Sequence, residues 1–196
     1  MRRRDLVKYS ALMLGVSASG SLAGAVLAGV ETTSKLKTPV FNLNQRQLVA
    51  ALAELIIPAT DTPGAIEAGV PRFIEILAGE WYTDVERTIF YSGLESLDQF
   101  CAKNFGEVFA ACDTAEQSAA LSQAERDAAG YLGPTGGFMG GEPDEKAPFF
   151  TKIKELTVIG YYTSEVGAKQ ELHYNPMPMR YEGDYDFADA GRQWSS

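Results

Sequence analysis

Apolar residues recur every three or four positions through most of this chain, and no segment alternates apolar and polar residues for long. The first spacing is typical of helices that bury one face, and the second would indicate half-buried strands. We therefore predict a mainly α protein, an irregular helical bundle in which strands are few.

Helix start signals divide this pattern into segments. Two of them are capping boxes, in which Thr83 and Asp113 are each followed three residues later by a glutamate. Pro58 ends the first predicted helix, whose apolar stripe includes Leu48 and Leu52. The predicted starts are Asn44, Pro71, Thr83, Asp113 and Pro148.

Two segments depart from the helical pattern. Residues 130–148 contain six glycines and three prolines, which predicts a long Gly/Pro-rich loop. The C-terminal segment combines tyrosines with prolines from Tyr174 to Tyr181 and ends near Trp194. We expect an extended aromatic and Pro-rich tail that lies on a surface, its own or that of another protein.

The first residues indicate export. Arg3-Arg4 is followed by Leu6, Val7 and Lys8 and then by an uncharged run over residues 9–30, which is typical of a twin-arginine signal that the twin-arginine translocase recognises. An ordinary secretory signal, with the second arginine incidental, is the alternative. Either signal predicts a periplasmic protein.

The predicted cleavage site is Ala23-Gly24-Ala25, whose small residues suit the signal peptidase. Retention of the run as an anchor is the alternative. The predicted organisation is a signal over 1–25, a linker over 26–43 and a single helical domain over 44–196. The net charge of −9 becomes about −12 once the basic signal is removed, and such an acidic body excludes nucleic acid as a partner.

Cys101 and Cys112 are the only cysteines. On one straight helix they would lie roughly 16 Å apart, too far for a disulfide, so they can pair only if the chain turns near Gly106. Free thiols and a bond to a partner are the alternatives.

Motifs for catalysis or for cofactors are missing. The sequence has no Cys-x-x-Cys, and no Gly-x-Gly-x-x-Gly follows a predicted strand, so we predict no catalytic, cofactor-binding or metal residue in this chain. His173 could formally combine with Ser164 and Glu165 in a hydrolytic site, but a structural or interfacial histidine is the preferred interpretation. The tail carboxylates Glu182, Asp184, Asp186 and Asp189 lack the spacing of a calcium loop.

Several stretches resemble a known family. The most specific runs from Phe149-Phe150-Thr151-Lys152 to Glu165-Val166-Gly167 and continues as Glu171-Leu172-x-Tyr174-x-Pro176-x-Pro178. Leu55 to Ala65, Gly69-Val70-Pro71 and the ending Arg192-Gln193-Trp194 add to it. The chain resembles the gluconate 2-dehydrogenase subunit 3 family, the small (gamma) subunits of membrane-bound FAD-dependent sugar, sugar-acid and polyol dehydrogenases.

The resemblance implies a non-catalytic accessory subunit. Its partners would be a large FAD-dependent subunit of the glucose–methanol–choline type and a multihaem cytochrome c subunit that holds the complex at the inner membrane. FAD and haem c would sit in those subunits, and the large subunit would select the substrate. The small subunit would carry the export signal for the folded flavoprotein and stabilise it.

The aromatic segments are the predicted contact with that partner, and Tyr161 and Tyr162 could instead complete the core. A stand-alone periplasmic binding or scaffold protein, and an enzyme that uses His173 by itself, are the rival functions. The interface candidates are Tyr161, Tyr162, Thr163, Ser164, Glu165, Tyr174, Pro176, Met177, Pro178, Met179 and Tyr181.

Overall fold

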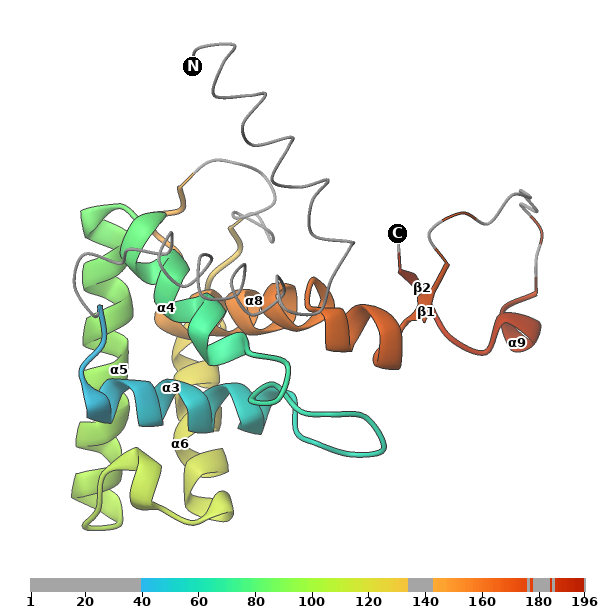
Figure 1. Cartoon of the computed structure of the whole chain (residues 1–196). Coiled ribbons are helices and arrows are strands. Elements are labelled where there is room, and N and C mark those ends of the chain that lie inside the picture. Colours follow the sequence, from blue (N-terminus) through green and yellow to red (C-terminus); the bar gives the residue numbers. More distant parts are fainter. Residues whose placement is uncertain (1–39, 134–142, 176, 178–183, 185, 196) are drawn as a thin grey trace, which may run out of the picture. The chain divides into compact units, whose positions relative to one another are not determined.

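A computed structural model describes residues 40–133, 143–175, 177, 184 and 186–195 (Figure 1). The predicted export signal with its cleavage site and the centre of the Gly/Pro-rich loop lie outside these residues. The same holds for four interface candidates in the tail, which are Pro176, Pro178, Met179 and Tyr181.

Within the described ranges the chain is mainly helical, which confirms the predicted fold class. Strands are limited to one pair of two residues each. The elements are α3 (Leu43–Ile56), α4 (Val70–Glu80), α5 (Asp84–Asn104), the 3-10 helix η1 (Phe109–Ala111), α6 (Thr114–Ala128), α8 (Phe149–Tyr162), the π-helix η2 (Gly167–Glu171), β1 (His173–Tyr174), α9 (Phe187–Ala190) and β2 (Trp194–Ser195).

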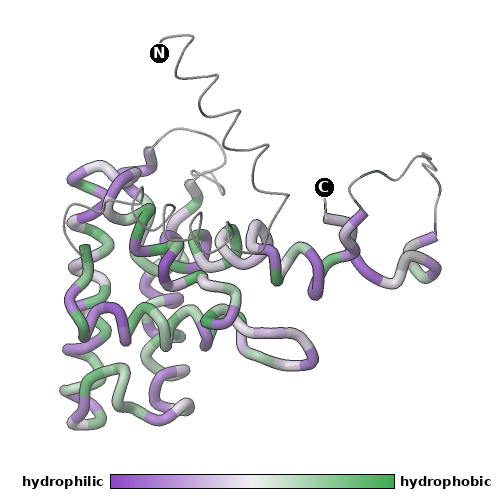
Figure 2. Tube along the Cα trace, in the orientation of Figure 1, coloured by the Kyte–Doolittle hydropathy of each residue, from purple (hydrophilic) through white to green (hydrophobic). Residues whose placement is uncertain are grey.

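Helix α8 is the element that the others share, because it packs against α3, α4, α5 and α6 (Figure 1). Its buried residues recur at three- and four-residue intervals and meet Phe90 and Leu94 of α5 in one core cluster. Apolar and polar residues are interspersed along the helices in Figure 2, as expected when one face of each is buried. The buried residues of α8 are Phe149, Lys152, Ile153, Leu156, Thr157, Gly160 and Tyr161.

Capping boxes begin three of these helices. The boxes at Thr83 and Asp113 are as predicted. The first helix, however, is capped by Asn42 with Gln45, so the predicted cap at Asn44 is wrong. Phe41 explains the choice, because its buried ring stacks on Phe90 and fixes where the chain enters the helix.

A buried ion pair joins α5 to α8. Lys152 Nζ lies 2.9 Å from Glu86 Oε1, and the two side chains are 3% and 2% exposed. Glu86 Oε2 accepts the N–H of Thr83 at 3.0 Å, which completes the capping box of α5. Glu86 Oε1 also accepts the N–H of Asp144, and Lys152 donates to the carbonyl of Asp144 at 2.7 Å. We call this group the Glu86 cluster.

The environment of Glu86 shifts its pKa. Burial by itself raises the pKa of this carboxyl, but the Lys152 ammonium and the N–H groups of Thr83 and Asp144 outweigh burial and hold it below its usual value. Glu86 is therefore a carboxylate in the folded protein, and one side chain both starts α5 and fastens α8 to it.

Asp144 also closes the base of the Gly/Pro-rich loop. The hydroxyl of Tyr131 donates to the Asp144 carboxylate, which in turn accepts the N–H groups of Lys146 and Ala147. The two ends of the segment between Tyr131 and Asp144 are thus held together, and the second end is held to Glu86.

The C-terminal segment has more regular structure than an extended tail. β1 pairs with β2 in parallel, with His173 opposite Trp194, and the N–H of His173 donates to the carbonyl of Gln193 at 2.8 Å. The pair brings the end of the chain back to the segment that follows η2.

Candidate partner-binding site

The loop between α3 and α4 is shaped by one carboxylate. Glu54 accepts the N–H of Ala59 at 3.1 Å with one oxygen and the N–H of Ile66 at 2.9 Å with the other. Gly64 lies against this carboxylate, where a Cβ would come within 2.2 Å of Glu54 Oε1. The loop therefore has a defined path over residues 57–69.

This loop is bound to the region where α8 ends. Tyr161 donates its hydroxyl to the carbonyl of Pro63 at 2.8 Å, and Thr62 donates to Glu171 in η2 at 2.6 Å. These contacts join residues about a hundred positions apart. Two of the stretches that carry the family resemblance, 55–65 and 149–171, thus form one surface feature.

Two adjacent tyrosines at the end of α8 have opposite surroundings. Tyr161 is 1% exposed and belongs to the core, whereas Tyr162 is 42% exposed, and the two rings meet edge to face at 5.4 Å. Of the two roles that the sequence left open, the structure places Tyr161 in the core. Tyr162 is available to a partner. Helical phase carries this distinction, since Tyr161 continues the buried stripe through Ile153 and Thr157.

The three residues after this pair form the end of the helix. Thr163 donates to the carbonyl of Ile159, and Ser164 donates to the carbonyl of Tyr161 at 2.6 Å while accepting the N–H of Gly167 at 3.0 Å. The Ser164 hydroxyl therefore shapes a turn, the role usual for a serine at this position.

Glu165 pairs with Lys169 one turn further on, with 2.7 Å between carboxylate and ammonium. The hydrogen bond and charge of Lys169 lower the pKa of Glu165, and Glu165 raises that of Lys169. Both groups of the hypothetical hydrolytic site, Ser164 and Glu165, thus have structural partners of their own.

His173 stacks on Trp194. The ring centroids are 4.0 Å apart with an angle of 24° between the planes, and both side chains are exposed. The two stacked residues lie opposite each other in the β1–β2 pair, an arrangement consistent with the predicted structural or interfacial histidine.

Several large apolar side chains are exposed in the last part of the chain. Tyr162 leads through η2 to Tyr174 on β1, and Trp194 on β2 lies next to that strand. Ile66 is exposed in the loop that Tyr161 and Thr62 attach to this end. Exposed aromatic and methionine side chains are enriched where proteins bind one another. We call this set the aromatic surface: Ile66, Val158, Tyr162, Tyr174, Met177 and Trp194.

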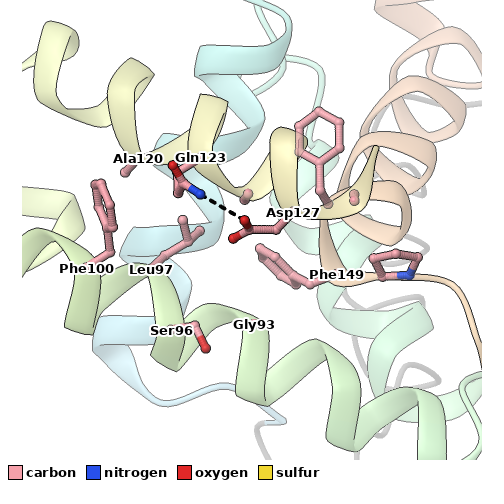
Figure 3. Close-up of a pocket in the computed structure, with 12 residues that line it drawn as sticks. Gly93, Ser96, Leu97, Phe100, Ala120, Gln123, Asp127 and Phe149 are labelled. Carbon is pink, nitrogen blue, oxygen red and sulfur yellow. Dashed lines mark hydrogen bonds between the residues drawn. The ribbon is translucent and has the colours of Figure 1, made fainter. Parts of the chain in front are cut away.

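A pocket of about 240 Å³ lies between α5, α6 and the start of α8 (Figure 3). Leu97 and Phe100 line it from α5 and Phe149 from α8, while Gln123 donates to Asp127 at 2.8 Å on the α6 side. The lining is mostly apolar, and its amide and carboxylate satisfy each other.

Among the described residues no three His, Cys, Asp or Glu side chains form a group that could hold a metal ion. Asp184, Asp186 and Asp189 are exposed, and Asp186 accepts the N–H of Ala188. In the same part of the chain, no helix has both the length and the apolar character needed to cross a bilayer.

Sequence reasoning missed the Glu86 cluster. Lys152 occupies a buried position of the stripe on α8, and a lysine there signals a buried carboxylate partner. The partner could not be chosen, because Glu86 lies 66 positions away and had a local role as the capping-box glutamate.

Comparison with protein families gives one match. The family model described as Gluconate 2-dehydrogenase subunit 3 matches residues 44–179, which is more than half of the chain. No curated protein and no solved structure gives a significant match to this chain.

The match covers most of the helical body, and the chain belongs to the gluconate 2-dehydrogenase subunit 3 family. Membership makes it a subunit of a dehydrogenase, with the other subunits as its partners. The predicted resemblance is confirmed.

Proposed function

We propose that this chain is the non-catalytic small subunit of a periplasmic FAD-dependent dehydrogenase that oxidises a sugar, a sugar acid or a polyol. It binds the large flavoprotein subunit of the glucose–methanol–choline type, stabilises it, and carries the twin-arginine signal with which both are exported. A multihaem cytochrome c subunit holds the complex at the inner membrane and accepts the electrons.

The observation that carries this proposal is the aromatic surface on a chain of this family. Tyr162 at the end of α8, Tyr174 on β1 and Trp194 on β2 all expose large rings, and the two strands pair with each other. Aromatic rings supply contact area with few rotatable bonds, so their burial by a partner is favourable at low entropic cost. The Glu165 and Lys169 pair at the same end provides a polar rim.

Co-purification tests the binding surface. The large subunit and its bound flavin, followed by absorbance, should come down with the wild-type chain. Tyr162→Ala combined with Trp194→Ala should weaken binding at least ~10-fold, the size expected for aromatic anchors. Val85→Ala with Val108→Ala is the matched control, because both valines are about half exposed but lie outside the aromatic surface. If both double variants recover equal amounts of the large subunit, the aromatic surface is not the interface.

Fractionation tests the export role. Arg3→Lys with Arg4→Lys should leave both this chain and the flavoprotein in the cytoplasm, and deletion of the chain should leave the flavoprotein there, unstable or inactive. Normal periplasmic activity of the large subunit in either strain would contradict the proposal. The control is Lys37→Arg, which exchanges one basic residue for another outside the signal and should leave export unchanged.

A further inference from the structure

The chain reverses direction between its two cysteines. Cys101 lies in the last turn of α5, whose end is closed by N–H groups of Phe105 and Gly106 on the Cys101 carbonyl. Gly106 has φ +85°, in the left-handed region that a residue without Cβ adopts easily. The turn brings η1, and after it Cys112, back along α5.

A side-chain clamp fixes this return. The Asp98 carboxylate on α5 accepts the N–H of Phe109 in η1 at 3.0 Å, and Gln117 of α6 donates to the Phe109 carbonyl at 3.0 Å. Cys101 follows Asp98 by one helical turn, and Cys112 follows Phe109 by one 3-10 turn. Asp98 and Phe109 are bonded to each other, and each lies three residues before one of the cysteines.

Both thiols are buried in the same core cluster, at 0% and 7% exposure for Cys101 and Cys112. Both are free thiols, Cys112 Sγ donates to the carbonyl of Glu107 at 4.0 Å, and the two thiols are close enough to shift each other's pKa. Two neighbouring thiols, on segments that the Asp98 and Gln117 side chains hold to each other, are placed for oxidation to a disulfide.

We propose that Cys101 and Cys112 are a disulfide site, which closes a loop over residues 102–111 and fastens the end of α5 to the start of α6. The oxidant is a disulfide donor, either a small-molecule disulfide or a protein disulfide. The oxidising compartment that supplies it rests on the proposed export.

The exchange balances in two steps. Cys112, the more accessible thiol, loses its proton and attacks one sulfur of the donor, whose other sulfur leaves as a thiolate. Cys101 then loses its proton and attacks the Cys112 sulfur of the mixed disulfide, which releases the second donor sulfur. Two electrons pass from the cysteine pair to the donor, whose two sulfurs take up the two protons and become thiols.

The surroundings of the pair make this reaction slow in the folded chain. Burial, the neighbouring Cys112 thiol and nearby carboxylates raise the pKa of Cys101 to about 12, and burial also raises that of Cys112. Thiolate is scarce at neutral pH, so the rate should rise roughly tenfold for each pH unit. The carboxylates that face the pair are Asp98 on α5, Glu107 before η1 and Glu116 on α6.

Oxidation of the purified full-length chain with oxidised glutathione tests the site. After denaturation, iodoacetamide should label neither cysteine, and peptide mapping without reductant should give one cross-linked peptide lighter by two hydrogen atoms. Reduction should lower the Tm by roughly 5–10 °C. Cys101→Ser and Cys112→Ser, each keeping one thiol, should give no such peptide and no reduction-dependent Tm shift.

Two outcomes overturn the inference: both cysteines still labelled after oxidation, or glutathione attached to Cys112 while Cys101 stays free. The mapping uses the unaltered chain, so misfolding of a serine variant does not affect it. In cells, a chain found outside the cytoplasm with two free thiols refutes the disulfide and leaves export standing. A chain retained in the cytoplasm refutes the proposed export, and the purified chain still decides the disulfide.

Discussion

Two lysine–glutamate pairs at the two ends of α8 have nearly the same length and very different surroundings. Lys152 and Glu86 are 2.9 Å apart and almost fully buried, whereas Lys169 and Glu165, just beyond the helix, are 2.7 Å apart and 52% and 79% exposed. Water and ions screen the second pair, and the first has only protein around it.

The energetic contribution of an ion pair thus depends on its surroundings more than on the distance between its two charges. Removal of one partner from a buried pair leaves a charge that water cannot reach, which is where the large energetic effect arises. The first half of α8 accordingly holds the body together. The second half also places Leu156, Thr157 and Tyr161 in the interior, while Tyr162 at its end is exposed and available to a partner.

The largest effect is expected for Glu86→Gln. Glutamine still caps α5, so the substitution isolates the lost charge and leaves the Lys152 ammonium buried. We expect a loss of about 3–5 kcal/mol in the free energy of unfolding, measured by urea denaturation followed by circular dichroism. Addition of Lys152→Met should recover much of it, and no recovery would contradict the assigned cause.

The second-largest effect on stability is expected from acid, which protonates the buried Glu86 carboxylate. The native pKa of Glu86 is lowered, so below the unfolded-state value of about 4.3 the unfolded chain binds a proton that the folded chain does not. The contribution of Glu86 is fully present above that pH and is lost as the pH falls toward the native pKa. Thermal unfolding from pH 7 to 3 should show a steeper decline for the wild type than for Glu86→Gln. Parallel curves would contradict this.

Glu75→Gln probes an intermediate case. Glu75 is buried at 6% exposure, but its partners Arg46 and Arg72 are about half exposed and can return to water. We expect a loss of about 1–2 kcal/mol by the same denaturation measurement, between the two pairs of the comparison. A loss as large as that of Glu86→Gln would show that burial of the carboxylate alone decides the effect.

The smallest effect is expected for Glu165→Gln. Both side chains of this pair are exposed to water. The midpoint of urea unfolding of the variant should therefore equal that of the wild type within experimental error, at low and at high salt. Binding of the large subunit is the more sensitive measurement, because the pair borders the aromatic surface. A clear loss of stability would remove the contrast between the two ends of α8.

Local signals predicted much of the fold. The capping boxes at Thr83 and Asp113 depend only on residues three apart, and both form as predicted. The start of α3 was missed by two residues because an asparagine precedes a glutamine by three positions twice, at 42–45 and 44–47. The buried ring of Phe41 selects the first, and that contact is tertiary.

The candidate site was less predictable for the same reason. The sequence showed an aromatic, Pro-rich end, but the bond from Tyr161 to Pro63 depends on segments 98 positions apart. The parallel pairing of β1 with β2 was also not foreseen, because strands of two residues leave no periodic pattern. Long-range contacts decide which aromatic residues are covered and which are exposed.

The bond from Tyr131 to Asp144, with Glu86 on the Asp144 N–H, makes the chain tolerant of added length at one place. The cost of closing a loop grows by only about 0.6 kcal/mol for each doubling of its length, provided that its ends stay fixed. Residues inserted between these two ends would therefore leave the register of α6 and α8 unchanged. An affinity tag or a fluorescent label could be placed there while α6 and α8 keep their packing.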